Sequence, residues 1–193
     1  MKKVTMLVVC TLALALCAGS AWAQSPPADT LKVDYFSNAN TEGAPDATLR
    51  IDNPGTSGGN LCAAIFVFDV YQEMSECCSC LVTPDGLRTL SIDKDLTSNP
   101  ATGSSLTGGV IKIVSSASSS STCPNPTGPK GLNPTPAVRA WTTHIQNSNW
   151  TITETAAQDA TLSSTELTGL ENGCHAIHLI GSGSGICSCG SGD

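Results

Sequence analysis

Alternating apolar and polar residues predict short β-strands along most of the chain. Residues 31–36 alternate, and residues 47–52 place Leu49 and Ile51 on one face. Residues 61–71 form the most apolar run downstream of residue 23, and β-branched and aromatic side chains dominate it. We predict a central strand there, buried on both faces. A buried helix is the alternative, because periodicity cannot separate the two structures over this length.

The segment from residue 76 to residue 92 predicts a β-hairpin. Residues 76–82 are extended, Thr83-Pro84-Asp85-Gly86 has turn composition, and residues 87–92 alternate again. A polar connection of residues 93–109 follows. The remaining expected strands are residues 110–114, 137–145, 150–155, 174–180 and 186–189. Many short strands separated by turns indicate an all-β fold, a disulfide-stapled β-sandwich or barrel-like domain with long Ser/Pro/Gly-rich loops.

Residues 1–23 have the pattern of a secretory signal peptide. Two lysines precede a short apolar run, and Ala21-Trp22-Ala23 supplies a small-x-small site, so we expect cleavage after Ala23. A membrane anchor is one alternative, but spanning a bilayer takes roughly 20 apolar residues and this run is shorter. Lipidation of Cys17 is another, although the large Leu16 stands where a bacterial lipobox has a small residue.

The expected mature chain therefore starts at Gln24 and is secreted or periplasmic. Residues 24–30 contain two prolines, and we predict a flexible arm there. Residues 31–193 are long enough to form a single β domain with its own core. Residues 115–136 are rich in Ser, Pro and Gly, a composition that also suits a linker between two domains. Because Cys123 lies inside this segment, we interpret it as a long loop that a disulfide ties to the domain.

Composition supports an exported β protein and disfavours two classes of partner. Only 13% of the residues are charged, and Ser, Thr, Gly and Asn supply the remaining polarity, which suits strands and loops. Loss of Lys2 and Lys3 with the leader leaves 7 basic and 16 acidic residues, a net charge of −9. An acidic surface repels phosphate groups, so we expect neither nucleic acid nor anionic lipid as a partner. No second apolar run is long enough for a transmembrane segment.

Eight cysteines lie beyond the expected leader, and an even number in an oxidising compartment is typical of a disulfide framework. In an extended segment Cys78 and Cys80 share a face, as Cys187 and Cys189 do. Two bridges between these pairs would join the predicted hairpin to the last strand, and the other four cysteines would form two more. Spacing alone does not assign this connectivity. The disulfide candidates are Cys62, Cys77, Cys78, Cys80, Cys123, Cys174, Cys187 and Cys189.

A metal site is the alternative use of the C-terminal cysteines. His175 and His178 follow Cys174 closely, and thiolates with imidazoles suit zinc or copper. However, Cys-x-Cys is tighter than the usual spacing in structural zinc sites. On a strand, His175 and His178 would also face opposite sides, which argues against paired ligation. We therefore expect no metal or other cofactor, and we interpret His144 as a half-buried position on a strand.

No catalytic motif is complete in the sequence. Residues 181–185 resemble a nucleophile elbow, but Gly183 occupies the position of the serine. Asp93 and Asp95 begin a run of oxygen-bearing side chains that lacks the glycine and the final glutamate of an EF-hand, so a solvated loop is expected. There is no Cys-x-x-Cys redox motif. These observations predict a protein that is not an enzyme.

Three segments carry a resemblance to a group of proteins. The sequences ECCSC (76–80), TPDGLRTLS (83–91) and DLTSNP (95–100) resemble parts of uncharacterised, cysteine-rich, secreted bacterial proteins of the acidobacterial kind. No activity is known for that group, so the resemblance transfers no catalytic residue to this chain.

The sequence thus favours a non-enzymatic exported domain with a structural or binding role and an unknown ligand. One alternative is a subunit of an extracellular surface assembly or filament, in which residues 24–36 add a strand to the sheet of a neighbour. Its partner would be another copy or a cell-surface protein. A second alternative is a secreted hydrolase whose site the motifs do not reveal.

Overall fold

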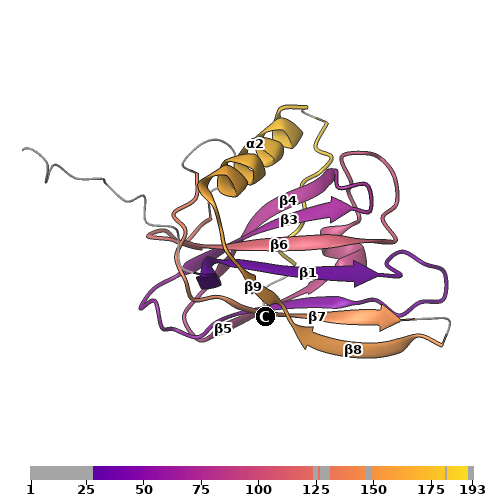
Figure 1. The fold of residues 1–193 in the computed structure, drawn as a ribbon, viewed down its shortest axis with the longest axis horizontal. Coiled ribbons are helices and arrows are strands. Elements are labelled where there is room, and N and C mark those ends of the chain that lie inside the picture. Colours follow the sequence, from indigo (N-terminus) through magenta and orange to yellow (C-terminus); the bar gives the residue numbers. More distant parts are fainter. Residues whose placement is uncertain (1–27, 124–125, 127–130, 147–148, 181, 191–193) are drawn as a thin grey trace, which may run out of the picture.

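Two antiparallel β-sheets pack face to face in the computed structural model, which describes residues 28–123, 126, 131–146, 149–180 and 182–190 (Figure 1). The first sheet has the order β4 (Met74–Val82), β3 (Leu61–Asp69), β6 (Gly108–Ala117), β1 (Leu31–Ser37) and β9 (Gln158–Ala160). The second has the order β5 (Gly86–Ser91), β2 (Thr48–Asn53), β7 (Arg139–Gln146) and β8 (Thr151–Ala156). The described residues also form three helical segments: η1 (Ala28–Thr30), η2 (Ile92–Leu96) and α2 (Ser164–Ile180).

This architecture confirms the predicted mostly-β, disulfide-stapled fold as a sandwich whose sheets do not close into a barrel. The expected leader with Cys17, and residues 24–27 of the expected arm, lie outside the described residues. Among the residues that are described, no helix is both long and apolar enough to cross a bilayer.

β3 is the central strand that the apolar run at residues 61–71 predicts, and the buried-helix alternative is wrong. Its side chains alternate between two cores. Ile65 and Val67 face the core between the sheets, whereas Ala64 and Phe66 face a second core on the outer side of the first sheet. Because both faces of β3 are covered, its sequence lacks the alternation of a half-solvated strand.

The other predicted strands before residue 160 also form, with small changes in their limits. Residues 31–36 lie in β1, 47–52 in β2, 110–114 in the longer β6, and 137–145 and 150–155 in β7 and β8, which pair with each other. Residues 115–117 belong to β6, so the long Ser/Pro/Gly-rich loop begins only after Ala117.

The predicted hairpin of residues 76–92 is wrong. β4 pairs with β3, whereas β5 pairs with β2 in the other sheet. The turn before Gly86 therefore carries the chain from one sheet to the next. The reason is that Val82 and Leu90 both bury their side chains in the core between the sheets, so the two strands face each other across that core instead of lying side by side.

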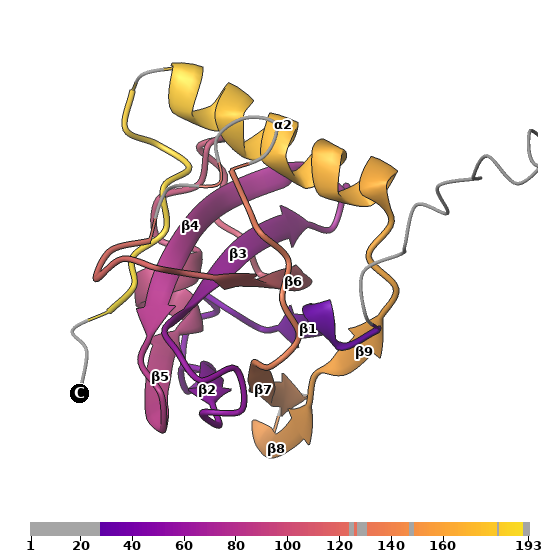
Figure 2. The ribbon, with the colours of Figure 1, turned by 90° about the vertical axis from the view of Figure 1, so that its left-hand side faces the viewer.

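The predicted strand at residues 174–180 is also wrong, because these residues end the helix α2. Ser163 caps this helix, since its Oγ accepts a hydrogen bond of 3.0 Å from the backbone N of Glu166. Leu170, Cys174 and Ile177 lie on one helical face and bury themselves against the outer side of the first sheet. Figure 2 shows α2 lying across β4 and β3.

The last predicted strand, residues 186–189, does not form a full strand. A single parallel bridge joins Ile186 to Cys77, and the chain continues beside β4 in an irregular conformation. The backbone N of Cys77 donates to the carbonyl O of Gly185 at 2.8 Å, and the N of Cys187 donates to the O of Cys77 at 3.3 Å. Residues 185–187 therefore cover the outer edge of β4.

Candidate binding cleft

The two sheets meet along one side of the sandwich, where β8 leads directly into β9. At Ala157 the chain leaves the second sheet and joins the first, and the N of Ala157 donates to the O of Ala140 at 2.9 Å. β1 and β7 lie next to each other along this side. The side chains of Ser37 and Asn38 both donate to the O of Ile145, at 2.8 and 2.6 Å. We call this line of contact the seam.

A cluster of polar side chains is buried at the seam. His144 on β7 and Asp34 on β1 have side chains only 1% and 7% exposed. The Nε2 atom of His144 lies 2.7 Å from Oγ1 of Thr155 and 3.5 Å from Oδ1 of Asp34. The same Oδ1 accepts a hydrogen bond of 2.9 Å from the backbone N of Tyr35. His144 is thus fully buried, which corrects the sequence interpretation of a half-buried position.

A shallow cleft lies over this cluster. It has a volume of about 390 Å³, which falls in the range of small-molecule sites. The ring of Tyr35 stacks on the imidazole of His144, with 4.2 Å between ring centroids, and remains about half exposed. The lining is mainly apolar, with Asp34, Thr155 and Gln158 as its polar members: Val33, Asp34, Tyr35, Val110, Thr155, Ala156 and Gln158.

Two atoms of the cluster are buried without a hydrogen-bond partner among the described residues, Oδ2 of Asp34 and Nδ1 of His144. Leaving a buried polar atom unpaired costs about 1–3 kcal/mol. An apolar pair at these positions would avoid that cost, so stability does not explain the cluster. This is the strongest indication of a functional site in the described part of the chain.

The geometry suits hydrogen bonding to a ligand better than proton relay. In a hydrolytic triad the nucleophile contacts one imidazole nitrogen and the carboxylate holds the other. Here Thr155 and Asp34 both approach Nε2 of His144, and Nδ1 has neither contact. The carboxylate therefore does not orient the imidazole as a general base for the Thr155 hydroxyl.

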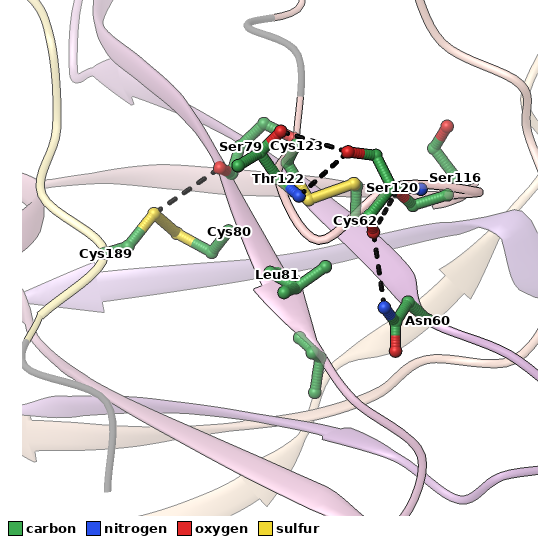
Figure 3. Close-up of a disulfide and its surroundings, with 12 residues drawn as sticks. Asn60, Cys62, Ser79, Cys80, Leu81, Ser116, Ser120, Thr122, Cys123 and Cys189 are labelled. Carbon is green, nitrogen blue, oxygen red and sulfur yellow. Dashed lines mark hydrogen bonds between the residues drawn. A yellow bond between two sulfur atoms is a disulfide. The ribbon is translucent and has the colours of Figure 1, made fainter.

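All eight candidate cysteines form disulfides. The predicted pairing of the two Cys-x-Cys segments is confirmed, as Cys78–Cys187 and Cys80–Cys189. The other four cysteines pair as Cys62–Cys123 and Cys77–Cys174. Figure 3 shows how Cys62–Cys123 fastens the Ser-rich loop to β3, near the hydrogen bond of 3.2 Å from Nδ2 of Asn60 to the O of Ser120. The expected attachment of this loop is therefore confirmed.

The two candidate metal-binding histidines lie on α2, so the strand geometry expected for them is wrong. His178 lies close to the sulfur atoms of Cys77 and Cys174. Those sulfurs are bonded to each other and provide no thiolate, which leaves a single imidazole at this place. Burial, and then the neighbouring His175, lower the pKa of His178. This environment favours a neutral imidazole packed against the disulfide.

Glu76 on β4 is a buried ionisable residue whose role the sequence does not reveal. It is 0% exposed, and burial raises its pKa from 4.5 to about 7. A hydrogen bond of 2.8 Å from the backbone N of Asn99 to Oε1 opposes this rise, while Oε2 has no partner among the described residues. Asn99 also binds the C-terminal segment, because the N of Gly185 donates to its O at 2.5 Å. Glu76 therefore supports the loops that cover β4.

The remaining sequence candidates have structural roles. Asp93 and Asp95 belong to the short helix η2, and not to the solvated loop expected there. Their carboxylates accept backbone hydrogen bonds from Asn40 and Ser91, at 3.0 and 2.8 Å. Gly185 has a positive φ of 81° and packs against Ile177, so it forms part of the C-terminal covering.

Part of the cleft could have been found from the sequence. In the hairpin of β7 and β8, Thr155 lies opposite Thr142, which places it diagonally across from His144. The two correctly predicted strands, which the structure has as β7 and β8, contain this information. Asp34 comes from β1, more than a hundred residues earlier in the chain, and no local pattern connects it with His144.

Comparison of the chain with protein-family models, with curated proteins and with solved structures found no match.

Proposed function

We propose that this protein is an exported, non-enzymatic domain that binds a small ligand in the seam cleft. The observation that carries the proposal is the buried Asp34–His144 pair beneath a half-exposed aromatic ring. Such a site combines an apolar wall with a few polar groups, as small-molecule sites do. The ligand chemistry that fits is a small apolar ring bearing one hydrogen-bonding group, which stacks on Tyr35 and reaches the hydroxyl of Thr155.

Two observations support export. Four disulfides are typical of proteins that mature in an oxidising compartment. Residues 1–23 have the composition of a cleavable leader. Together they favour a secreted or periplasmic protein that starts at Gln24. An intact mass of the protein from its native culture tests this, and a mass that includes lipidated Cys17 would contradict it.

Binding can be tested with benzylamine and phenol as probes, followed by amide chemical shifts. We expect millimolar binding with shifts concentrated in β1, β8 and β9. Tyr35→Ala should weaken binding about tenfold, because the stacking wall is lost. Tyr71→Ala is the matched control, since Tyr71 is 82% exposed on the β3–β4 turn and does not line the cleft. Equal affinities of the two variants, or shifts located elsewhere, would disprove the cleft as the site.

A hydrolase is the second candidate, and one contact favours it. The 2.7 Å between Oγ1 of Thr155 and Nε2 of His144 is the distance of a nucleophile from its base. Hydrolysis of p-nitrophenyl acetate by the wild type and by Thr155→Val separates the candidates. A catalytic hydroxyl requires a loss of activity of about a hundredfold or more. Binding alone predicts the same background rate for both proteins.

A further inference from the structure

The sandwich has four sheet edges, and among the described residues three of them are covered, short or flanked by another segment. The C-terminal segment covers β4 through the backbone hydrogen bonds of Cys77 described above. β9 has only three residues. Beside β5, the side chain of Arg88 donates to the carbonyl oxygens of Leu81 and Cys189, at 2.9 and 3.4 Å. Short or covered edges are common protections against pairing with other chains.

The fourth edge, β8, has no such protection from any segment that the structure describes. All six of its residues are exposed, and the strand lies at the outer limit of the second sheet (Figure 1). It contains no Pro and no Lys, its pairing with β7 has no bulge, and Thr and Ile suit extended structure. Its single charge, Glu154, is matched by Arg50 on the same sheet. This edge is therefore close to neutral, although the whole chain is acidic.

We infer that β8 pairs antiparallel with β8 of a second copy of this chain about a two-fold axis. The result is one sheet that continues across both copies. The contact is isologous, so it closes at a dimer and does not propagate into a filament. The surface-assembly alternative, in which residues 24–36 add a strand to a neighbour, is not the contact that we infer, since β1 is already paired on both sides by β6 and β9.

Charge selects the register of this pair. A two-fold axis perpendicular to the sheet keeps the side chain of each residue on the same face of the sheet in both copies. One residue of the strand must therefore lie directly opposite the same residue of the second copy, and we call this residue the centre of the pair. Centres at Thr153 and Glu154 both engage five residues of the strand. A centre at Glu154 places two carboxylates directly opposite, which is destabilising. A centre at Thr153 places Ile152 opposite Glu154 and separates the two carboxylates, and we assign this register.

The dimer is weak. Stable interfaces involve about 20–30 residues on each side, whereas this edge offers a single short strand. We expect a dissociation constant of about 10⁻⁵ to 10⁻³ M, measurable by sedimentation velocity of the mature oxidised protein over a concentration series. A wild-type protein that stays monomeric at millimolar concentration would overturn the inference.

Two lysine substitutions on neighbouring residues test the register. Thr153→Lys places two positive charges opposite each other and should weaken the dimer about tenfold or more. Ile152→Lys places its charge opposite Glu154 of the second copy, and it should change the dissociation constant of the dimer by less than about threefold. Thr56→Lys, on an exposed turn, is the matched control for charge. Equal effects at residues 152 and 153 would overturn the register, and no effect at either would overturn the edge itself.

Discussion

The edge strands β4 and β8 of this sandwich differ in whether another segment covers their free backbone groups. On β4 the free backbone groups are covered by residues 185–187, and two adjacent disulfides fix that covering. On β8, at the outer edge of the other sheet, no described segment covers the strand and every residue is exposed. The difference shows that covalent linkage in this chain is concentrated where buried groups need shielding. Glu76, Cys78 and Cys80 lie under the covered edge, whereas β8 has no buried side chain to protect.

The largest expected effect comes from removing the covering of β4. A chain ending at Gly185 loses both Cys187 and Cys189, whose bridges each span 109 residues. Because Cys77–Cys174 remains, Cys78–Cys187 closes an effective loop of roughly 15 residues and contributes about 3 kcal/mol, and the adjacent Cys80–Cys189 closes a shorter loop that adds about 2 kcal/mol. Whole domains have about 5–15 kcal/mol of stability. We expect this chain to be poorly folded or aggregated when exported, and thermal melts should show it.

A chain ending at Gly190 is the control, because it keeps all eight cysteines that form disulfides. It should melt like the full-length protein. Equal melting temperatures of the chains ending at Gly185 and Gly190 would show that the covering of β4 is dispensable. The contrast between the two edges would then have no energetic basis.

A smaller effect is expected when α2 is released from the same edge. Cys77 and Cys174 join β4 to the helix, and replacement of both by Ala removes this bridge. With Cys78–Cys187 intact, the Cys77–Cys174 bridge closes an effective loop of roughly 15 residues. A loop of this length contributes about 3 kcal/mol to the stability of the fold. Urea unfolding should show this loss with the bridges at Cys187 and Cys189 retained. The double replacement of Cys62 and Cys123, which tie the Ser-rich loop, provides the comparison.

The third prediction concerns pH and Glu76. Its folded pKa of about 7 lies above the ordinary value of 4.5, so the folded state binds the proton more tightly than the unfolded chain. The stability that this provides is complete below about pH 4.5 and is lost as pH rises through about 7. We expect a loss of about 2 kcal/mol, measured as the free energy of unfolding at pH 5 and pH 8.

Glu76→Gln keeps an acceptor for the backbone N of Asn99 and removes the ionisation. The variant should lack this loss and should be more stable than the wild type at pH 8. Glu154→Gln, at an exposed carboxyl on β8, is the matched substitution at the open edge and controls for the loss of one carboxyl group. If Glu76→Gln and the wild type had the same pH dependence, the buried carboxyl would have no role in the covered edge.

The smallest effect is expected at the open edge. Glu154→Ala removes the ion pair with Arg50, in which both side chains are more than a third exposed. Exposed pairs contribute about 0–1 kcal/mol, so we expect a change below about 0.5 kcal/mol in the monomer. Unfolding at micromolar concentration measures the monomer alone. A loss above 1 kcal/mol would show that β8 is coupled to the core more strongly than its exposure indicates.

The contrast between right and wrong predictions follows from the range of the interactions involved. β2 and β3 were found because their apolar patterns are local. The helix α2 was missed because Gly169 and Gly173 lower its helix propensity, although Ser163 and Glu166 have the spacing of a capping box and Ser163 Oγ accepts from the backbone N of Glu166. Gly173 has a packing role, since a Cβ there would lie 2.8 Å from the terminal carbon of Met74.

The sequence by itself determined the strand-rich composition, the count of paired cysteines, and the matching faces of the two Cys-x-Cys segments. These properties depend on residue type and on the two-residue period of an extended chain. Only the tertiary structure decided that β4 and β5 belong to different sheets, that Cys77 meets Cys174 on a helix, and that Asp34 reaches His144. Each of these contacts joins residues that no local period relates. They form because packing of the two cores outweighs the entropy of closing long loops, and no spacing in the sequence encodes that balance.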